Sequence, residues 1–325
     1  MSATTKMEDV DPASVEYLVY SSGGLCGWAF VGSDRALDEW LHEKGGPPLS
    51  ARLKGACGVS VGALFALARV IGCTSVELEE LFRRHAKQAN IKVHGTTMSD
   101  LLTAILSPQP LVDLVEDMIT RKFGDAMRGA SLTDLWRRTG KEFVVVATNR
   151  TAGFTRTLVS HRTFPDLKVA TAVIMSASFP LIYPPINVDG QLYVDGGISD
   201  STPTDIFPLE SSIVFTLTSP IEPKTIEEAL NESALASVWS MRQPILEKPL
   251  LERIKSFSTV QLRRINKVEV PSFSVLMFFD PPTNDYVDDM IQRGRFITRV
   301  FLESGRWTIA HSVHLLLVGR TLPPT

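Results

Sequence analysis

Gly58-Val59-Ser60-Val61-Gly62 is the stretch that decides how this chain folds and what chemistry it offers. A strand-like run, Leu53 to Cys57, precedes it, and an apolar helix-like run from Ala63 to Ile71 follows it. A serine at a tight strand-to-helix turn needs small residues two positions before and after it, because a β-carbon there would collide with the neighbouring strand or helix. The pattern therefore predicts a nucleophile elbow, with Ser60 as nucleophile and the two flanking glycines as its support. A merely structural glycine-rich turn is the alternative.

Bulk composition is that of a globular enzyme. The chain has 325 residues, 44% hydrophobic and 21% charged, which is enough to bury a substantial core. A net charge of −3 gives no reason to expect a nucleic-acid partner. Three cysteines, Cys26, Cys57 and Cys73, are too few and too irregularly spaced for a disulfide framework or a zinc site, which fits a cytoplasmic compartment. We expect neither a metal nor a cofactor.

Strand-like and helix-like segments alternate through the first two thirds of the chain, which predicts an α/β fold around a layered sheet. Residues 1–14 are rich in acidic side chains and are expected to form a disordered lead. We assign residues 15–210 to the catalytic core and residues 211–325 to an extension that packs on the same domain. In that extension Phe273 to Phe279 is a strand candidate and Tyr286 to Phe301 has helical spacing.

Two further glycine-rich stretches offer partners for Ser60. Ser22-Gly23-Gly24-Leu25-Cys26-Gly27 follows a strand-like run, Tyr17 to Tyr20, and Asp195-Gly196-Gly197 follows a later one. A parallel sheet would bring Asp195 to the same edge as Ser60. Each stretch taken alone is more often an ordinary turn, but the three in sheet-compatible order favour a catalytic site.

These motifs resemble the patatin-like phospholipase family over roughly Tyr17 to Pro203. The motifs that carry the resemblance are the loop Ser22 to Gly27, the elbow Gly55 to Leu64, the stretch Ala172 to Pro180, and Tyr193 to Gly197. The resemblance implies a three-layer α/β fold with a central, mostly parallel sheet and helices on both faces. It also implies a calcium-independent lipid acyl hydrolase that uses a Ser-Asp dyad.

The same resemblance assigns a role to each motif residue. Ser60 would attack a fatty-acyl ester to form an acyl-enzyme, and Asp195 would act as general base. Backbone amides at Gly23, Gly24 and Leu25 would form the oxyanion hole. The supporting glycines would be Gly27, Gly58, Gly62, Gly196 and Gly197. The substrate would be a phospholipid, a lysophospholipid or an acylglycerol, and transacylation is a close variant of the hydrolysis.

Two positions depart from the family pattern. The family's loop usually begins with glycine, where this chain has Ser22, and commonly carries a basic residue where this chain has Cys26. Ser22 is small enough to be tolerated. Loss of the basic side chain puts turnover or head-group preference in question, and Cys26 is either a packed small residue or an oxidation-sensitive thiol.

Two other interpretations stay open. Ser60, Asp195 and then His311 or His314 follow the Ser-Asp-His order of α/β-hydrolase triads, so an esterase triad is an alternative to the dyad. A non-catalytic lipid-binding or regulatory protein with the same fold is the rival from another functional class.

The lipid-binding surface is less clearly indicated. An acyl channel or ordinary core packing would each account for four apolar residues beside the site: Trp28, Phe30, Leu64 and Phe179. The segment Arg242 to Lys267 combines basic and apolar side chains, which is typical of a helix on an anionic lipid surface or of an amphipathic helix packed on the domain. Reversible membrane association of a cytoplasmic protein is therefore one option.

Overall fold

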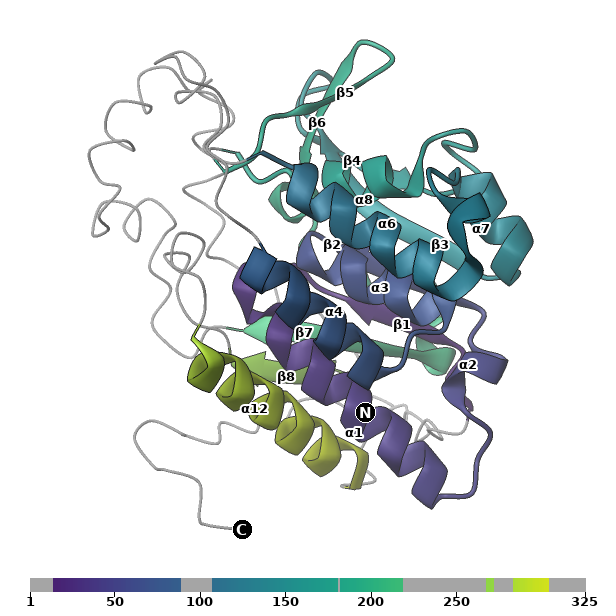
Figure 1. The fold of residues 1–325 in the computed structure, drawn as a ribbon, viewed down its shortest axis with the longest axis vertical. Coiled ribbons are helices and arrows are strands. Elements are labelled where there is room, and N and C mark those ends of the chain that lie inside the picture. The colour runs from purple at the N-terminus through teal and green to yellow at the C-terminus, as the bar shows by residue number, and fades with distance from the viewer. Residues whose placement is uncertain (1–13, 89–106, 181, 219–266, 272–282, 304–325) are drawn as a thin grey trace, which may run out of the picture.

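The structure, a computed structural model, describes residues 14–88, 107–180, 182–218, 267–271 and 283–303. They form a mixed α/β fold with one central sheet flanked by helices, as expected (Figure 1). The strands are β1 (Tyr17–Tyr20), β2 (Gly55–Val59), β3 (Glu142–Asn149), β4 (Thr155–Val159), β5 (Ile186–Val188), β6 (Gln191–Asp195), β7 (Ser212–Thr218) and β8 (Lys267–Pro271). The α-helices are α1 (Trp28–Glu43), α2 (Leu49–Arg52), α3 (Val61–Ile71), α4 (Ser75–Gln88), α6 (Gln109–Phe123), α7 (Leu132–Thr139), α8 (Val169–Ala177) and α12 (Asn284–Glu303).

Hydrogen-bonded neighbours in the sheet follow the order β5-β6-β3-β2-β1-β7-β8, and β4 also pairs with β3. The β1–β2, β2–β3, β1–β7 and β7–β8 pairs are parallel. The pairs that β3 makes with β4 and β6, and the β5–β6 pair, are antiparallel. The sheet is thus mixed, with its parallel part made by β3, β2, β1, β7 and β8. β2 and β1, the strands that lead into the elbow and the first glycine-rich loop, lie side by side.

One edge of β3 brings the ends of β2 and β6 together. Val59 of β2 pairs with Val146, and Asp195 of β6 pairs with the next residue, Ala147. β4 pairs with β3 at both of these β3 positions, so β2 and β6 must share the opposite edge. The expectation that a parallel strand delivers Asp195 was wrong, because β6 runs antiparallel to β3 and meets β2 end to end.

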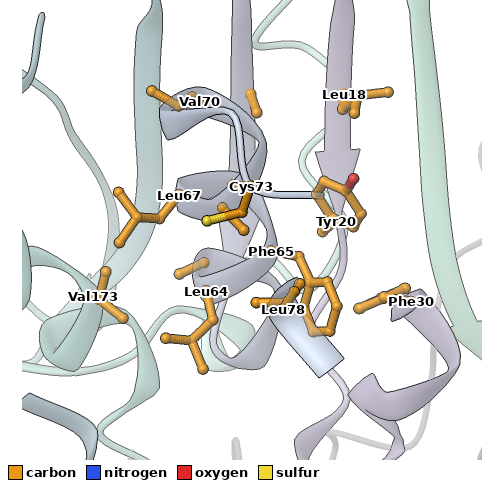
Figure 2. Close-up of a cluster of buried hydrophobic side chains, with 14 of the residues drawn as sticks. Leu18, Tyr20, Phe30, Leu64, Phe65, Leu67, Val70, Cys73, Leu78 and Val173 are labelled. Carbon is orange, nitrogen blue, oxygen red and sulfur yellow. The ribbon is translucent and has the colours of Figure 1, made fainter. Parts of the chain in front are cut away.

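The main core lies between the sheet and the helices. α3 is buried along its length from Gly62 to Ile71, as expected of a helix that is apolar on all sides except at Arg69. Figure 2 shows Phe65 of α3 beside Tyr20 and Phe30, with ring centroids 5.8 Å and 5.2 Å away. The other face of the sheet carries a smaller valine-rich cluster, packed by Leu158, Ile206 and Phe207. Phe30 is fully buried in this aromatic cluster, which favours core packing over an acyl channel for this side chain.

A buried polar network crosses this core and joins three elements next to the glycine-rich turns. Tyr20 Oη, at the end of β1, donates to Asp34 Oδ1 of α1 over 2.5 Å. Arg69 of α3 makes two hydrogen bonds, of 2.8 and 2.6 Å, to the carboxylate of Asp38 in α1. Its Nε also lies 3.8 Å from Asp34 Oδ1. Burial raises the pKa of Asp34 to about 6, although Arg69 favours the charged form.

The described elements after residue 211 belong to the same sheet and helical layer. β7 pairs with β1, and α12 packs along α1 (Figure 1). The backbones of the two helices are in contact where they cross. A Cβ at Gly32 would overlap the carbonyl oxygen of Ile291, and a Cβ at Gly294 would overlap the carbonyl oxygen of Ala29. The strand expected at Phe273 to Phe279 lies outside the described residues, as does the basic segment apart from its last residue.

The α1–α12 crossing predicts a steric penalty for the smallest substitution. Gly294→Ala should lower the free energy of unfolding by about 1–3 kcal/mol, because the added methyl group meets the Ala29 backbone, which has little freedom to move. Urea denaturation followed by circular dichroism measures the change. Gly46→Ala is the control, because its nearest contact would be an ordinary 3.5 Å to the Leu41 oxygen. In a helix without such a contact, replacing glycine by alanine raises stability by about 1 kcal/mol. A Gly294→Ala variant that is more stable than wild type would therefore contradict the tight crossing.

Candidate active site

Ser60 occupies the turn between β2 and α3 in a conformation that side chains rarely adopt. Its φ is 56° and its ψ is −123°, a strained geometry that costs on the order of 1–3 kcal/mol. Gly58 and Gly62 make the turn possible: a Cβ at Gly58 would overlap the Gly62 oxygen, and one at Gly62 would lie 2.5 Å from the carbonyl oxygens of Tyr20 and Ser21. The sequence therefore forms the sharp strand-to-helix turn that the glycine spacing predicts.

Asp195 ends β6 beside this turn and is almost fully buried, with 2% of its surface exposed. The Ser60 hydroxyl lies beside its carboxylate and favours its charged form, and its Oδ1 accepts the Gly197 N–H over 2.8 Å. The backbone is also held, since Thr148 Oγ1 donates to the Asp195 oxygen over 2.8 Å. The structure thus brings together the two side chains that the sequence analysis paired.

The surroundings of Asp195 change its acidity. Burial raises its pKa to about 7, although the hydrogen bonds from Ser60 and Gly197 favour the charged form. A carboxylate with a pKa near neutrality accepts a proton more readily than an exposed aspartate, whose pKa is about 3.9. Asp195 therefore combines contact with the Ser60 hydroxyl and the basicity required of a general base.

The first glycine-rich loop packs directly on the elbow. Gly24 has a φ of 53° and starts the 3-10 turn η2 (Gly24–Gly27), which continues into α1. The first N–H groups of a helical segment have no carbonyl acceptor within the same helix. Those of Gly24 and Leu25 can therefore donate hydrogen bonds to an anion. A Cβ at Gly27 would lie 2.5 Å from Val61 Cγ2. The loop and the elbow are therefore in contact at the residue after Ser60.

A serine from the stretch Ala172 to Pro180 also reaches the elbow. Ser176 of α8 accepts the Ser60 N–H through its hydroxyl over 2.9 Å, and Ser178 accepts the Asp195 N–H through its carbonyl oxygen, also over 2.9 Å. The sequence analysis included these two residues in the stretch Ala172 to Pro180 but assigned them no role. α8 and the residue that follows it thus hold the nucleophile and its partner through their backbones.

The two positions that depart from the family pattern contact different parts of the structure. Cys26 is buried, and Tyr286 Oη of α12 donates to its sulfur over 3.6 Å. Burial and this contact raise the pKa of Tyr286 well above its usual range. A packed residue is therefore the better interpretation of Cys26. Ser22 instead contacts Ser201, a residue that the sequence analysis did not consider.

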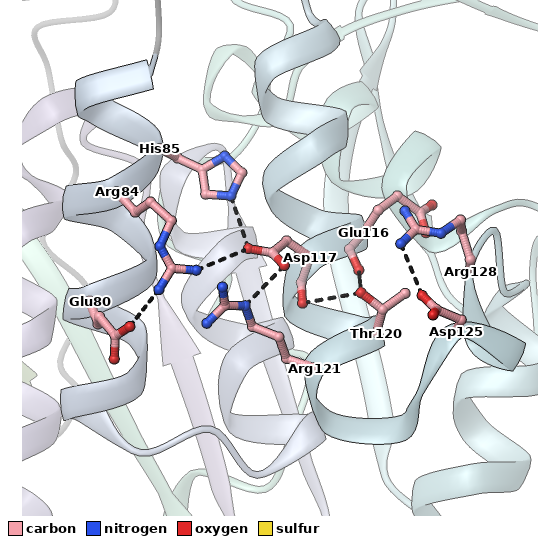
Figure 3. A network of polar contacts seen from close by, with 9 residues as sticks. All are labelled: Glu80, Arg84, His85, Glu116, Asp117, Thr120, Arg121, Asp125 and Arg128. Carbon is pink, nitrogen blue, oxygen red and sulfur yellow. Dashed lines mark hydrogen bonds and ion pairs between the residues drawn. The ribbon is translucent and has the colours of Figure 1, made fainter.

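Two of the three described histidines make contacts with other elements, and the third is exposed. His85 lies 3.2 Å from Asp117 in a polar network between α4 and α6 (Figure 3). His161 stacks on Trp136 and lies 3.5 Å from Glu142. Glu142 pairs with Gly55 at the start of β2, whereas Ser60 follows the end of that strand. His42 is exposed near the end of α1. His311 and His314, the candidates for a triad, lie outside the described residues.

Two searches of the described residues concern metals and membranes. In that part of the chain, no group of three or more His, Cys, Asp or Glu side chains is placed to hold a metal ion. None of its helices combines the length and apolarity needed to cross a membrane.

Comparison with known proteins agrees with this geometry. Residues 18–208 match the family model described as patatin-like phospholipase. Among curated proteins, the chain is 22% identical over 197 residues to "Probable lipid hydrolase 463L" of Invertebrate iridescent virus 6. It is 26% identical over 199 residues to "Uncharacterized protein R571" of Acanthamoeba polyphaga mimivirus. These alignments cover 60% and 61% of this chain, and 64% and 63% of the two relatives.

Among solved structures, VipD from Legionella pneumophila has the same fold. The comparison gives a TM-score of 0.54 at 17% identity, and it covers 90% of this chain and 67% of VipD. The match to the family model covers more than half of the chain and contains the elbow, the first glycine-rich loop and Asp195. The chain therefore belongs to the patatin-like phospholipase family.

Proposed function

We propose that this protein is a lipid acyl hydrolase that cleaves fatty-acyl esters through a Ser60 acyl-enzyme, with Asp195 as general base. The observation that carries the proposal is the placement of the Ser60 hydroxyl, on a strained elbow, beside the buried carboxylate of Asp195, whose pKa is raised to about 7. A strained nucleophile beside a matched base is typical of covalent catalysis. Membership of the family and the name of one relative, a probable lipid hydrolase, favour a lipid ester as substrate.

The first half of the reaction forms the acyl-enzyme. Ser60 Oγ attacks the acyl carbonyl carbon while its proton passes to Asp195, which gives a tetrahedral intermediate with a negatively charged oxygen. As the intermediate collapses, the bond to the alcohol breaks and Asp195 returns the proton to the departing oxygen. Ser60 then carries the acyl group and Asp195 is again ionised.

The second half releases the fatty acid. A water molecule gives a proton to Asp195 and attacks the acyl-enzyme, and the proton then returns to Ser60 as the acid leaves. The amides of Gly23, Gly24 and Leu25 are proposed to stabilise the charged oxygen in both halves. An alcohol in place of water would give transacylation by the same steps. Suitable substrates are phospholipids, lysophospholipids and acylglycerols.

The roles of Ser60, Asp195 and the two C-terminal histidines can be separated by substitution. Ser60→Ala should abolish labelling by an active-site fluorophosphonate, and Asp195→Asn should lower ester hydrolysis about 100- to 10,000-fold, because the proton acceptor is lost. His311→Ala and His314→Ala should keep activity. Gel fluorescence and hydrolysis of mixed glycerophospholipids and triacylglycerol provide the measurements, with the exposed Ser50→Ala as control. Loss of activity in either histidine variant would instead favour a triad, and an unlabelled wild type would favour a non-catalytic lipid-binding protein.

The raised pKa of Asp195 predicts the pH dependence of activity. Asp195 must be ionised to accept the proton, so kcat/KM should fall about tenfold per pH unit below its pKa of about 7 and level off above it. Steady-state hydrolysis of a soluble p-nitrophenyl ester between pH 5 and 9 measures the profile. A profile that stays flat down to pH 5 would contradict Asp195 as a base with this pKa.

The same pKa predicts that the site reduces stability. Because the folded-state pKa lies above the ordinary aspartate pKa of about 3.9, Asp195 favours folding most at low pH and progressively less as pH rises from about 4 to 7. Asp195→Asn has no such dependence, so its stability relative to wild type should rise by about 3 kcal/mol between pH 5 and pH 8. Urea denaturation of both proteins at the two pH values tests this. A pH-independent difference would show that burial of the charge carries no such penalty.

A further inference from the structure

Ser22 joins the first glycine-rich loop to the segment that follows Asp195. Its Oγ lies 2.6 Å from Ser201 Oγ, and its N–H donates to the Ser201 carbonyl oxygen over 3.0 Å. The two residues are 179 positions apart in the chain, and both are only partly exposed. This contact therefore connects two parts of the site through a side chain as well as through the backbone.

Ser201 is rigidly connected to Asp195. The residues between them form consecutive tight turns, in which the N–H groups of Ser199 and Asp200 donate to the Gly196 oxygen over 3.1 and 2.9 Å. Gly197 lies directly against Ser22, since a Cβ there would be 3.1 Å from both Ser22 Cβ and Ser22 Oγ. A shift of Ser201 relative to Ser22 would thus move the proposed oxyanion amides relative to the carboxylate.

β7 holds the opposite side of the loop. The Ser21 N–H donates to the Phe215 oxygen over 2.9 Å, and Ser21 Oγ accepts the Leu217 N–H over 3.0 Å. A Cβ at Gly23 would overlap the Leu217 side chain. The loop is therefore fixed to the sheet on one side, and Ser22 is its hydrogen-bonded contact with the Asp195 segment on the other.

We infer that Ser22 and Ser201 are positioning residues, whose hydroxyl pair sets the distance between the oxyanion amides and the Ser60–Asp195 pair. The inference rests on the proposed function. Neither serine is expected to touch the reacting atoms, so the pair acts through the geometry of the transition state. Loss of one such hydrogen bond should lower kcat roughly three- to tenfold while KM changes less than about twofold.

A double-mutant cycle in the full-length chain tests this inference. Ser22→Ala, Ser201→Ala and the double variant are compared for kcat and KM on a soluble p-nitrophenyl ester, and for the rate of fluorophosphonate labelling. Since both single changes break the same interaction, the double variant should be no slower than the slower single variant. Ser201→Thr keeps a hydroxyl and should restore at least half of the wild-type kcat.

Ser212→Ala is the matched control. It removes another serine hydroxyl bond, of 2.6 Å to the Pro208 oxygen, at the start of β7 where that strand pairs with the start of β1. It should match the Ser22→Ala and Ser201→Ala variants in thermal stability but keep wild-type kcat. Values of kcat within twofold of wild type in the Ser22→Ala and Ser201→Ala variants, or losses that multiply in the double variant, would overturn the positioning role alone. A wild type without hydrolysis or labelling would overturn the proposed function and this inference together.

Discussion

The missing side chain at Gly62 is the constraint on which the rest of the site depends. It lets the first turn of α3 lie directly against the carbonyl groups of Tyr20 and Ser21, so the elbow and the loop after β1 share a backbone surface. Gly58 extends this backbone surface to the strand before the turn, and Gly27 packs against the side chain of Val61. Because backbone contacts of this kind cannot relax by a change of rotamer, Ser60 is kept in its positive-φ conformation.

The local parts of the site could be predicted from the sequence, and its long-range parts could not. The elbow is encoded by residues within a few positions of one another, so its turn follows from glycine spacing. The strand before it was expected two residues too early, because Gly58 disfavours a strand unless its close neighbours are known. The direction of β6 depends on its pairing with β3, and the contacts of Ser176 and Ser201 depend on residues more than a hundred positions away. Such distant partners leave no local pattern.

The stability of the fold offsets features that disfavour folding at the site. A strained Ser60 and a buried Asp195 are both unfavourable. The helix α3, buried along nearly its whole length, and the aromatic cluster around Tyr20 supply apolar burial next to them. Arg69 adds a buried link between α3 and α1, so the helices that follow the elbow and the loop are joined away from the site as well as at it.

The position of β7 has a consequence for how the protein matures on the ribosome. The loop at residues 21–24 is made early, but its supports at Phe215 and Leu217 lie beyond the segment that matches the family model, which ends at residue 208. Domains generally fold as units during synthesis, from the N-terminus onward. A nascent chain that ends at residue 208 would contain both Ser60 and Asp195 and yet lack the strand that holds this loop in place.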